Sequence, residues 1–303
     1  MHAVEIREVT KSFGTHVAVD ALSLDVPPGT VYGFIGPNGS GKTTTLRMIM
    51  NILYPDRGRI RVLGEETRRA ASDRVGYLPE ERGLYKKMKV ADLLRYYAEL
   101  KGRRDFKQVV RAWLERMQLS EWGSQKVEAL SKGMAQKVQF IAAVIAEPEL
   151  IILDEPFTGL DPVNAEVLKD AVLELKRNGA TVIFSTHDMN VAEKMCDYIF
   201  MIFKGRKVLD GTLTDIQARY GADTIRVSLD RDTVDLTSIR GVQHVNDYGP
   251  FKEIRMDDGT DPQQILTALM SRAAVQRFEI TCPSLQDIFV RIAGPEAQEA
   301  TDA

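Results

Sequence analysis

The chain is poor in cysteine and has no long apolar run. Its two cysteines, Cys196 and Cys282, lie far apart and form no C-x-x-C pair, so we expect free, buried thiols in a reducing compartment. The most apolar stretch, residues 138–146, is much shorter than the roughly 20 residues that a membrane-spanning helix needs. The N-terminus is polar and strand-like, so we expect no signal peptide there. Any role at a membrane would therefore depend on a partner.

A strong net charge is also absent. The formal charge of −3 gives no indication of nucleic-acid binding. The charge is unevenly spread, because residues 223–303 hold 8 Lys+Arg against 14 Asp+Glu. This change in composition predicts a boundary between a large domain, residues 1–222, and a small one, residues 223–293. We expect the acidic tail, residues 294–303, to be disordered.

The large domain carries the alternation of strands and helices that is typical of a parallel α/β core. Early strands with alternating polarity predict an added antiparallel part. A helical block, about residues 84–135, interrupts the pattern and predicts an inserted helical subdomain. Strand-like runs occur at residues 4–9, 17–26, 31–35, 59–63, 75–78, 150–154 and 181–185.

The small domain has a different pattern, which predicts an α+β module. Asp261 followed by Pro262 is a typical helix start, and Ser284 with Asp287 resembles a capping box. The expected strands are residues 224–229, 241–248, 251–256 and 275–281.

A glycine-rich loop supplies the first chemical motif. GPNGSGKTT, residues 36–44, follows the apolar strand VYGFI and matches G-x-x-x-x-G-K-[ST]. Glycines let successive backbone N–H groups face one anion, and the next helix adds its positive end. Lys42 can bridge the β- and γ-phosphates, and the Thr43 hydroxyl can ligate Mg²⁺. The expected phosphate-binding residues are Gly36, Pro37, Asn38, Gly39, Ser40, Gly41, Lys42, Thr43 and Thr44.

A second motif, LIILDEP (150–156), places two carboxylates at the end of a buried strand. Asp154 suits a water-mediated contact with Mg²⁺, and Glu155 can polarise an attacking water molecule. A carboxylate pair at a strand end is usually only solvated, but the glycine-rich loop in the same chain favours the catalytic interpretation.

With four further motifs, these residues resemble the nucleotide-binding subunits of ABC transporters. LSKGMAQK (130–137) is similar to the family signature, FTGLDP (157–162) to the D-loop, FSTHDM (184–189) to the switch motif and KSFG (11–14) to the adenine-stacking segment. The motifs follow the family order across residues 4–220. The resemblance implies a P-loop NTPase cassette that binds ATP and Mg²⁺.

The resemblance also assigns roles to single residues. Two cassettes would pair head to tail and enclose two ATP molecules, so that Ser131 and the Gly133 backbone meet the γ-phosphate of the partner's ATP. Asp161 is the aspartate of the D-loop. His187 is either a γ-phosphate contact or a core or capping histidine, and Phe13 either stacks on adenine or belongs to the core.

Three residues depart from the family pattern. Lys132 replaces a signature glycine and Met134 a glutamine, but Ser131 and Gly133 remain, so we expect function to persist. Lys132 either adds positive charge near phosphate or is solvated. Glu80 occupies the position of the Q-loop glutamine, where its carboxylate is a suitable Mg²⁺ ligand. The alternative is a solvated Glu80, with the metal held by Thr43, Asp154, phosphates and water.

Three classes of function remain open at this stage. GYLPEERGLY, LSKG and PSLQDIF resemble bacterial exporter cassettes of the sodium-efflux and drug-efflux type, which implies an ATPase subunit that powers export through separate integral membrane permease subunits. Its other partner would be a second copy or a paralogous cassette, at the inner, cytoplasmic face of the membrane. The alternatives are a soluble ABC ATPase acting on the ribosome or DNA, and a nucleotide-dependent binding switch. The C-terminal module would regulate, dimerise or support the dimer.

Overall fold

The computed structural model describes residues 2–66, 72–81, 83–103, 105–220, 223–230, 234–257 and 259–294. The chain divides into two compact units, Met1–Thr212 and Leu213–Ala303. The division falls before residue 222 because helix α7, Leu213–Tyr220, belongs with the second unit, where Gln217 Nε2 donates to the Pro283 carbonyl at 3.2 Å. Residues 295–303, on which the expected disorder of the tail falls, lie outside the described residues.

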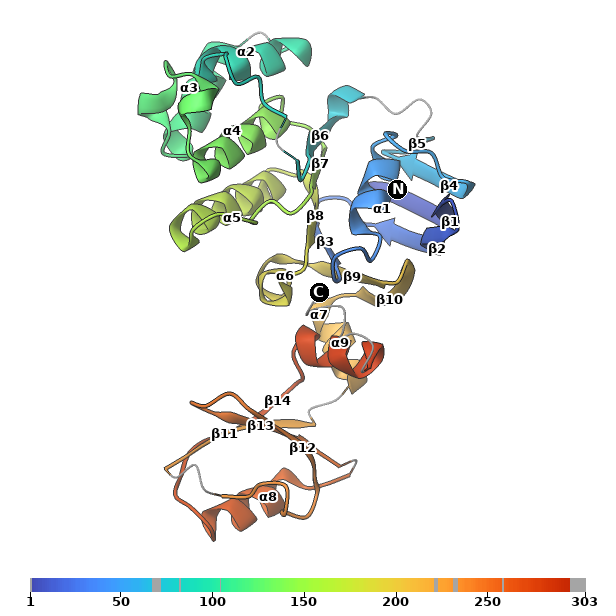
Figure 1. Cartoon of the computed structure of the whole chain (residues 1–303), viewed down its shortest axis with the longest axis vertical. Helices are drawn as coiled ribbons and strands as arrows, with labels where there is room; N and C mark the ends of the chain where they lie inside the picture. Colours follow the sequence, from blue (N-terminus) through green and yellow to red (C-terminus); the bar gives the residue numbers. More distant parts are fainter. Residues whose placement is uncertain are drawn as a thin grey trace. The chain divides into compact units, whose positions relative to one another are not determined.

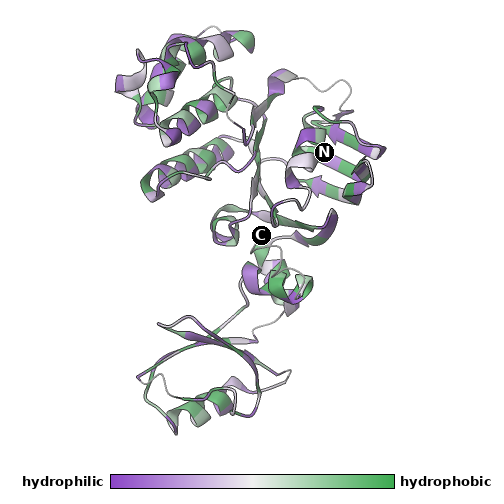
Figure 2. Cartoon of the chain, in the orientation of Figure 1, coloured by the Kyte–Doolittle hydropathy of each residue, from purple (hydrophilic) through white to green (hydrophobic). Residues whose placement is uncertain are grey.

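The first unit is built on a six-stranded sheet in the order β10-β9-β3-β8-β7-β6 (Figure 1). All neighbours from β9 to β6 are parallel, and β10 runs antiparallel to β9. The predicted parallel core is therefore confirmed, and Figure 2 shows apolar residues along its strands. Its strands are β3 Val31–Ile35, β6 Val75–Leu78, β7 Leu150–Leu153, β8 Thr181–Thr186, β9 Tyr198–Phe203 and β10 Arg206–Gly211.

An antiparallel sheet covers one face of the central sheet, as predicted. Its order is β2-β1-β4-β5, with β1 Val4–Phe13, β2 His16–Val26, β4 Arg57–Val62 and β5 Glu65–Glu66. Because successive side chains of a strand point to opposite faces, Leu150 and Ile152 of β7 join one core with this sheet and helix α1, Lys42–Ile49. Ile151 and Leu153 point to the other core.

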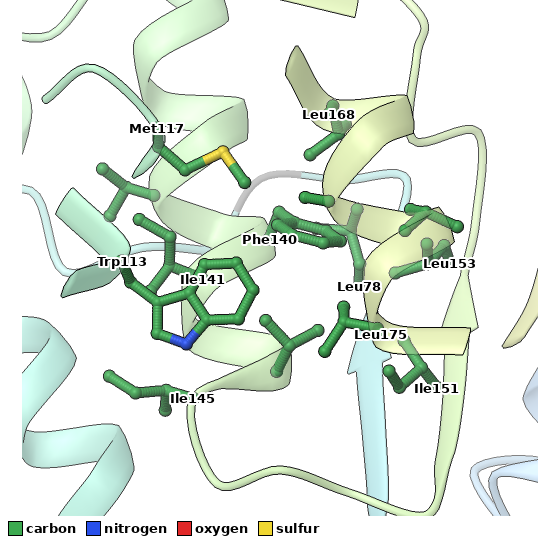
Figure 3. Close-up of a cluster of buried hydrophobic side chains, with 14 of the residues drawn as sticks. Leu78, Trp113, Met117, Phe140, Ile141, Ile145, Ile151, Leu153, Leu168 and Leu175 are labelled. Atoms are coloured by element: carbon green, nitrogen blue, oxygen red, sulfur yellow. The ribbon is translucent and has the colours of Figure 1, made fainter. Parts of the chain in front are cut away.

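Helices pack against the opposite face of the central sheet. Trp113 meets Phe140 edge-on, with ring centroids 6.0 Å apart, and Leu78 and Leu168 complete the same cluster (Figure 3). Helix α4 approaches β6 closely because residue 76 is glycine: a Cβ there would lie 2.2 Å from the Ala143 carbonyl oxygen. The helices are α2 Val90–Leu100, α3 Phe106–Arg116, α4 Lys132–Val144, α5 Pro162–Arg177 and α6 Met189–Met195, with short turns η2 Ser72–Arg74, η3 Ser120–Trp122 and η4 Val127–Ala129.

The second unit contains an antiparallel sheet, β12-β13-β11-β14, covered on one face by α8. Both predicted helix starts are present: Asp261 accepts from the Gln263 N–H at 2.9 Å, and Ser284 forms a capping box with Asp287. The elements are β11 Thr224–Leu229, β12 Val242–Asp247, β13 Lys252–Met256, α8 Pro262–Met270, β14 Val275–Thr281 and α9 Leu285–Ala293. The predicted α+β module is confirmed.

Two expectations from composition can be compared with the structure. Cys196 and Cys282 are free thiols, as expected, but both are half-buried rather than buried. Among the helices that the structure describes, none has the length and apolar character needed to cross a membrane.

We expect a chain that ends at Thr212 to fold and to bind ATP, because every nucleotide motif precedes this point. A chain that ends at residue 222 should aggregate more readily. It keeps α7 with its buried Ile216 but loses the unit to which α7 belongs, and exposing such a side chain costs about 1.5–3 kcal/mol. Circular dichroism, light scattering and nucleotide binding compare the two chains. Loss of ATP binding in a folded 1–212 chain would contradict this expectation.

Candidate nucleotide-binding site

The loop between β3 and α1 can form only with glycine at two positions. Gly36 has φ 150° and a Cβ there would lie 2.2 Å from the Ile202 carbonyl oxygen; Gly41 has φ 109° and a Cβ would lie 2.5 Å from the Ala18 carbonyl oxygen. Helix α1 starts after Gly41 without a side-chain cap. Its first backbone N–H groups therefore have no side-chain acceptor and form a site suited to an anion.

Lys42 lies inside this loop and is only 6% exposed. Its Nζ donates to the Gly36 carbonyl at 2.7 Å and the Pro37 carbonyl at 3.0 Å. Burial lowers the pKa of Lys42, and the nearby charges of Glu155, Asp154 and Glu80 oppose this shift. The ammonium group is thus held at the centre of the loop, where it would meet an incoming phosphate.

Asp154 is fully buried at the end of β7. Its Oδ1 accepts from the Ser185 hydroxyl at 2.6 Å and the Thr43 hydroxyl at 3.2 Å, whereas Oδ2 is buried with no hydrogen-bond partner in the described part of the chain. Burial raises the pKa of Asp154, and the two hydroxyl donors oppose that shift. A buried carboxylate oxygen without a partner fits a divalent cation with a preference for oxygen ligands.

Glu155 has an unusual backbone conformation, with φ 49°. Its N–H donates to the Ser185 hydroxyl at 2.9 Å, which helps to hold this conformation. The carboxylate is bound by two side chains: His187 Nδ1 lies 3.1 Å from Oε1, and the Thr158 hydroxyl donates to Oε2 at 3.0 Å. Lys42 Nζ lies 3.9 Å from Oε1. A strained residue with an oriented carboxylate beside the P-loop is typical of a catalytic position.

A cavity of about 400 Å³ joins Lys42 and Glu155 to Phe13 of the KSFG segment. Phe13 is half exposed at its edge, and Lys11 Nζ lies 5.6 Å from the centre of its ring. His16 and Ala18 also line the cavity, and the sequence analysis missed both. The other lining residues are Asn38, Gly39, Gly41, Lys42, Thr43, Thr44, Glu80 and Glu155.

The side chains of Glu80 and of its neighbour Glu81 have different surroundings, and only Glu80 lines this cavity. Glu80 lines the cavity together with Thr43. Glu81 is not among the lining residues, and its carbonyl accepts from Gln139 Nε2 of α4 at 3.3 Å. Within the described ranges, no group of three or more His, Cys, Asp and Glu side chains forms a metal cage. A metal here would need ligands besides such side chains.

Eight of the expected site residues do not line the cavity: Gly36, Pro37, Ser40, Asp154, His187, Ser131, Gly133 and Asp161. The last three lie at the starts of two helices. Ser131 caps α4 and accepts from the Met134 N–H at 3.3 Å. Asp161 caps α5, and the hydrogen bonds that it accepts from Asn164 lower its pKa. A Cβ at Gly133 would lie 3.4 Å from the Leu160 side chain. Ser131 and Asp161 are exposed, and Gly133 is half-buried.

The parallel sheet, the glycine-rich loop and the two carboxylates at the end of β7 define a P-loop ATPase of the α/β class. A family model described as "ABC transporter" matches residues 19–158. A second, described as "ATP-binding protein DrrA1-3-like, C-terminal domain", matches residues 211–293. The chain belongs to the family of ABC transporter ATP-binding proteins, whose members bind nucleotide and are ATPases. The resemblance stated from the motifs is therefore confirmed.

Relatives along nearly the whole length support this assignment. The ABC transporter ATP-binding protein YhaQ of Bacillus subtilis (strain 168) is 42% identical over 95% of this chain and 98% of its own. The linearmycin resistance ATP-binding protein LnrL of the same strain is 30% identical over 96% and 98%. The Nod factor export ATP-binding protein I of Rhizobium sp. (strain N33) is 33% identical over 98% and 99%.

A solved structure shares the fold of the cassette. The structure described as that of an ATP binding subunit of an ABC transporter superposes with a TM-score of 0.69 and 31% identity, covering 72% of this chain and 93% of its own.

Proposed function

We propose that the protein is the ATP-hydrolysing subunit of an ABC exporter, which pairs with a second cassette and drives separate membrane subunits. One observation carries the proposal: the cavity holds the P-loop and Glu155, whereas signature Ser131 and D-loop Asp161 begin helices outside it. A second cassette, a copy of this chain or a paralogue, would bring these two groups to the nucleotide. The names of relatives in linearmycin resistance and Nod factor export support export as the direction of transport.

The catalytic roles follow from the contacts around Glu155. Lys42 would exchange its hydrogen bonds to the Gly36 and Pro37 carbonyls for phosphate oxygens. Glu155 would accept the proton of the attacking water. Because a carboxylate only accepts hydrogen bonds, His187 carries a proton on Nδ1 toward Glu155.

Mg²⁺ fits the oxygen atoms at the end of β7. The candidate ligands are the Thr43 hydroxyl, the unpartnered Oδ2 of Asp154 and the Glu80 carboxylate, which are the hard oxygen donors that Mg²⁺ prefers. When bound, the ion would neutralise charge on the nucleotide phosphates. Magnesium in such sites usually takes its other ligands from the phosphates and water.

An exposed apolar surface of the helical subdomain suits a protein partner. Tyr85 and Tyr96 are 53% and 40% exposed, and their rings meet edge-on at 6.0 Å. Leu100, at the end of α2, is 62% exposed. Aromatic residues gathered on one surface are enriched where proteins associate. The membrane subunits would dock on this part of the helical subdomain, at the cytoplasmic face of the membrane.

Association with membrane proteins tests the proposed function. The tagged chain would be expressed with the membrane proteins of adjacent reading frames, purified in detergent and assayed for ATPase activity. We expect co-purification and a rise in ATP hydrolysis in the complex. Sedimentation with ribosomes or DNA, without association with any of these membrane proteins, would favour the soluble class of ABC ATPase.

We expect Glu80 to affect the response to magnesium. Replacement by alanine should raise the Mg²⁺ concentration for half-maximal ATPase activity by about tenfold, whereas Glu80→Gln should retain much activity because an amide oxygen also ligates Mg²⁺. A Mg²⁺ titration measures the change. Glu81→Gln is the matched control, since the side chain of Glu81 is not part of the cavity. Superimposable curves for Glu80→Ala and the unaltered chain would exclude a role in the site.

A further inference from the structure

Helix α4 carries a buried lysine, Lys137, at the end of the signature segment, residues 130–137, and the sequence analysis assigned no role to it. Lys137 is only 3% exposed, and lysine is almost never buried to this extent without a partner. Its Nζ donates to Asn164 Oδ1 at 2.7 Å. Burial lowers the pKa of Lys137, and the charge of Asp161 opposes this shift. The ammonium therefore lies within electrostatic reach of the D-loop aspartate.

Asn164 links Lys137 to Asp161 through hydrogen bonds. Its Nδ2 donates to Asp161 Oδ2 at 2.5 Å, and its backbone N–H donates to Oδ1 at 3.0 Å. The side-chain oxygen of Asn164 thus accepts from Lys137. Its side-chain and backbone N–H groups donate to the two oxygens of Asp161. This orients the carboxylate through a continuous chain of charge-assisted hydrogen bonds.

Other residues of α4 contact the rest of the same segment, residues 156–164. Gln136 Nε2, which is buried, donates to the Pro156 carbonyl at 3.2 Å. The Lys132 side chain lies 3.3 Å from the point where a Cβ of Gly159 would stand, and Leu160 lies 3.4 Å from the corresponding point of Gly133. The segment is therefore fixed to α4 at its start, its middle and its end.

Thr158, near the start of this segment, contacts the carboxylate of Glu155. Thr158 donates to Glu155 Oε2 at 3.0 Å, and Ser131 caps the helix that holds the segment. The signature cap, Asp161 and Glu155 are consequently linked through one set of contacts. A displacement of α4 would move all three.

We propose that Lys137 is a positioning residue of the ATPase: through Asn164 it holds Asp161 in a fixed relation to Ser131, so that one cassette presents both groups together to the nucleotide of its partner. The proposal rests on the proposed function, because it assumes that two cassettes pair. The proposal also explains why position 137 holds a lysine. The four-carbon stem spans the distance from α4 to α5, and the ammonium donates to the amide oxygen of Asn164.

The test uses the full chain in the Glu155→Gln background, where ATP is retained. We expect Lys137→Met to leave ATP affinity within about twofold but to raise the dissociation constant of the ATP-bound dimer about tenfold, which corresponds to ~1.4 kcal/mol. Lys137→Arg should restore most of the association, because it keeps the donor. Sedimentation velocity at saturating ATP and a fluorescent nucleotide measure the two quantities. Lys169→Met, which removes a partly buried lysine paired with Glu166 on α5, is the control.

A double-mutant cycle separates positioning from general destabilisation. If Lys137 acts through Asn164, then Lys137→Met with Asn164→Ala should weaken the dimer no more than either change alone. Additive effects, or an unchanged dimer in Lys137→Met, would overturn the inference. Should Lys137→Met fail to fold, a variant of the half-buried Asn164 provides the test. An Asn164→Ala protein that forms the ATP-bound dimer with an unchanged dissociation constant would overturn the inference. If Glu155→Gln alone stays monomeric in ATP, also with the membrane partner present, the proposed function fails and this inference falls with it.

Discussion

Replacing Glu155 by glutamine is expected to lower steady-state ATP hydrolysis by about 10²–10⁴-fold, the usual contribution of a general base. Glutamine keeps the shape of the side chain and an oxygen for the Thr158 hydroxyl, but it cannot take a proton from water. Binding of ATP should persist because Lys42 and the P-loop are unchanged. A coupled ATPase assay and equilibrium nucleotide binding measure both effects. Glu121→Gln, an exposed glutamate in η3, is the control.

The same variant should accumulate as a dimer in saturating ATP. If pairing encloses the nucleotide and hydrolysis reopens the pair, a chain that binds ATP without turnover stays closed. Light scattering or sedimentation of Glu155→Gln with and without ATP shows the change in mass. Hydrolysis within a few-fold of the unaltered chain would rule out Glu155 as the base. A monomer at tens of micromolar protein, also with the membrane partner present, would contradict the sandwich.

The central strands could be predicted because their signal is local. β3, β7 and β8 are short apolar runs, and every residue in them is buried, so that composition alone identifies them. β9 and β10 were missed although their signal is also local: YIFMIF, residues 198–203, is apolar and ends at a turn where Lys204 and Gly205 have positive φ. Helix α4 starts at Lys132, and Ser131 caps it.

Contacts between strands explain what the sequence did not reveal about the site. Ser185 donates a hydrogen bond to Asp154 because β8 lies beside β7, with Leu153 opposite Phe184. The sequence of either strand alone does not reveal which strands are neighbours in the sheet. His16 joins the cavity through its pairing with Phe13 at the end of the β1–β2 hairpin. The P-loop was predictable because one continuous segment supplies its backbone donors. Thr158 and Lys137 were not, because each acts through a residue whose position depends on helix packing.

Replacing Lys42 by methionine is expected to lower ATP affinity by about 100-fold, which corresponds to ~2.7 kcal/mol. The ammonium is the cation at the centre of the loop, and hydrogen bonds to charged groups contribute about 1.5–3 kcal/mol each. Methionine retains most of the apolar stem, so the buried space stays filled. Only the donor to the Gly36 and Pro37 carbonyls and the cation 3.9 Å from Glu155 are removed.

Equilibrium binding of a fluorescent ATP analogue measures this loss, and thermal unfolding without nucleotide checks that the chain still folds. Glu155 keeps its hydrogen bonds with His187 and Thr158, so we expect only a small change in the unfolding midpoint. Lys126→Met, which removes an exposed lysine outside the cavity, should bind ATP as the unaltered chain does. A folded Lys42→Met protein with ATP affinity within threefold of the control would show that the backbone N–H groups of the loop, rather than the ammonium, supply the phosphate binding.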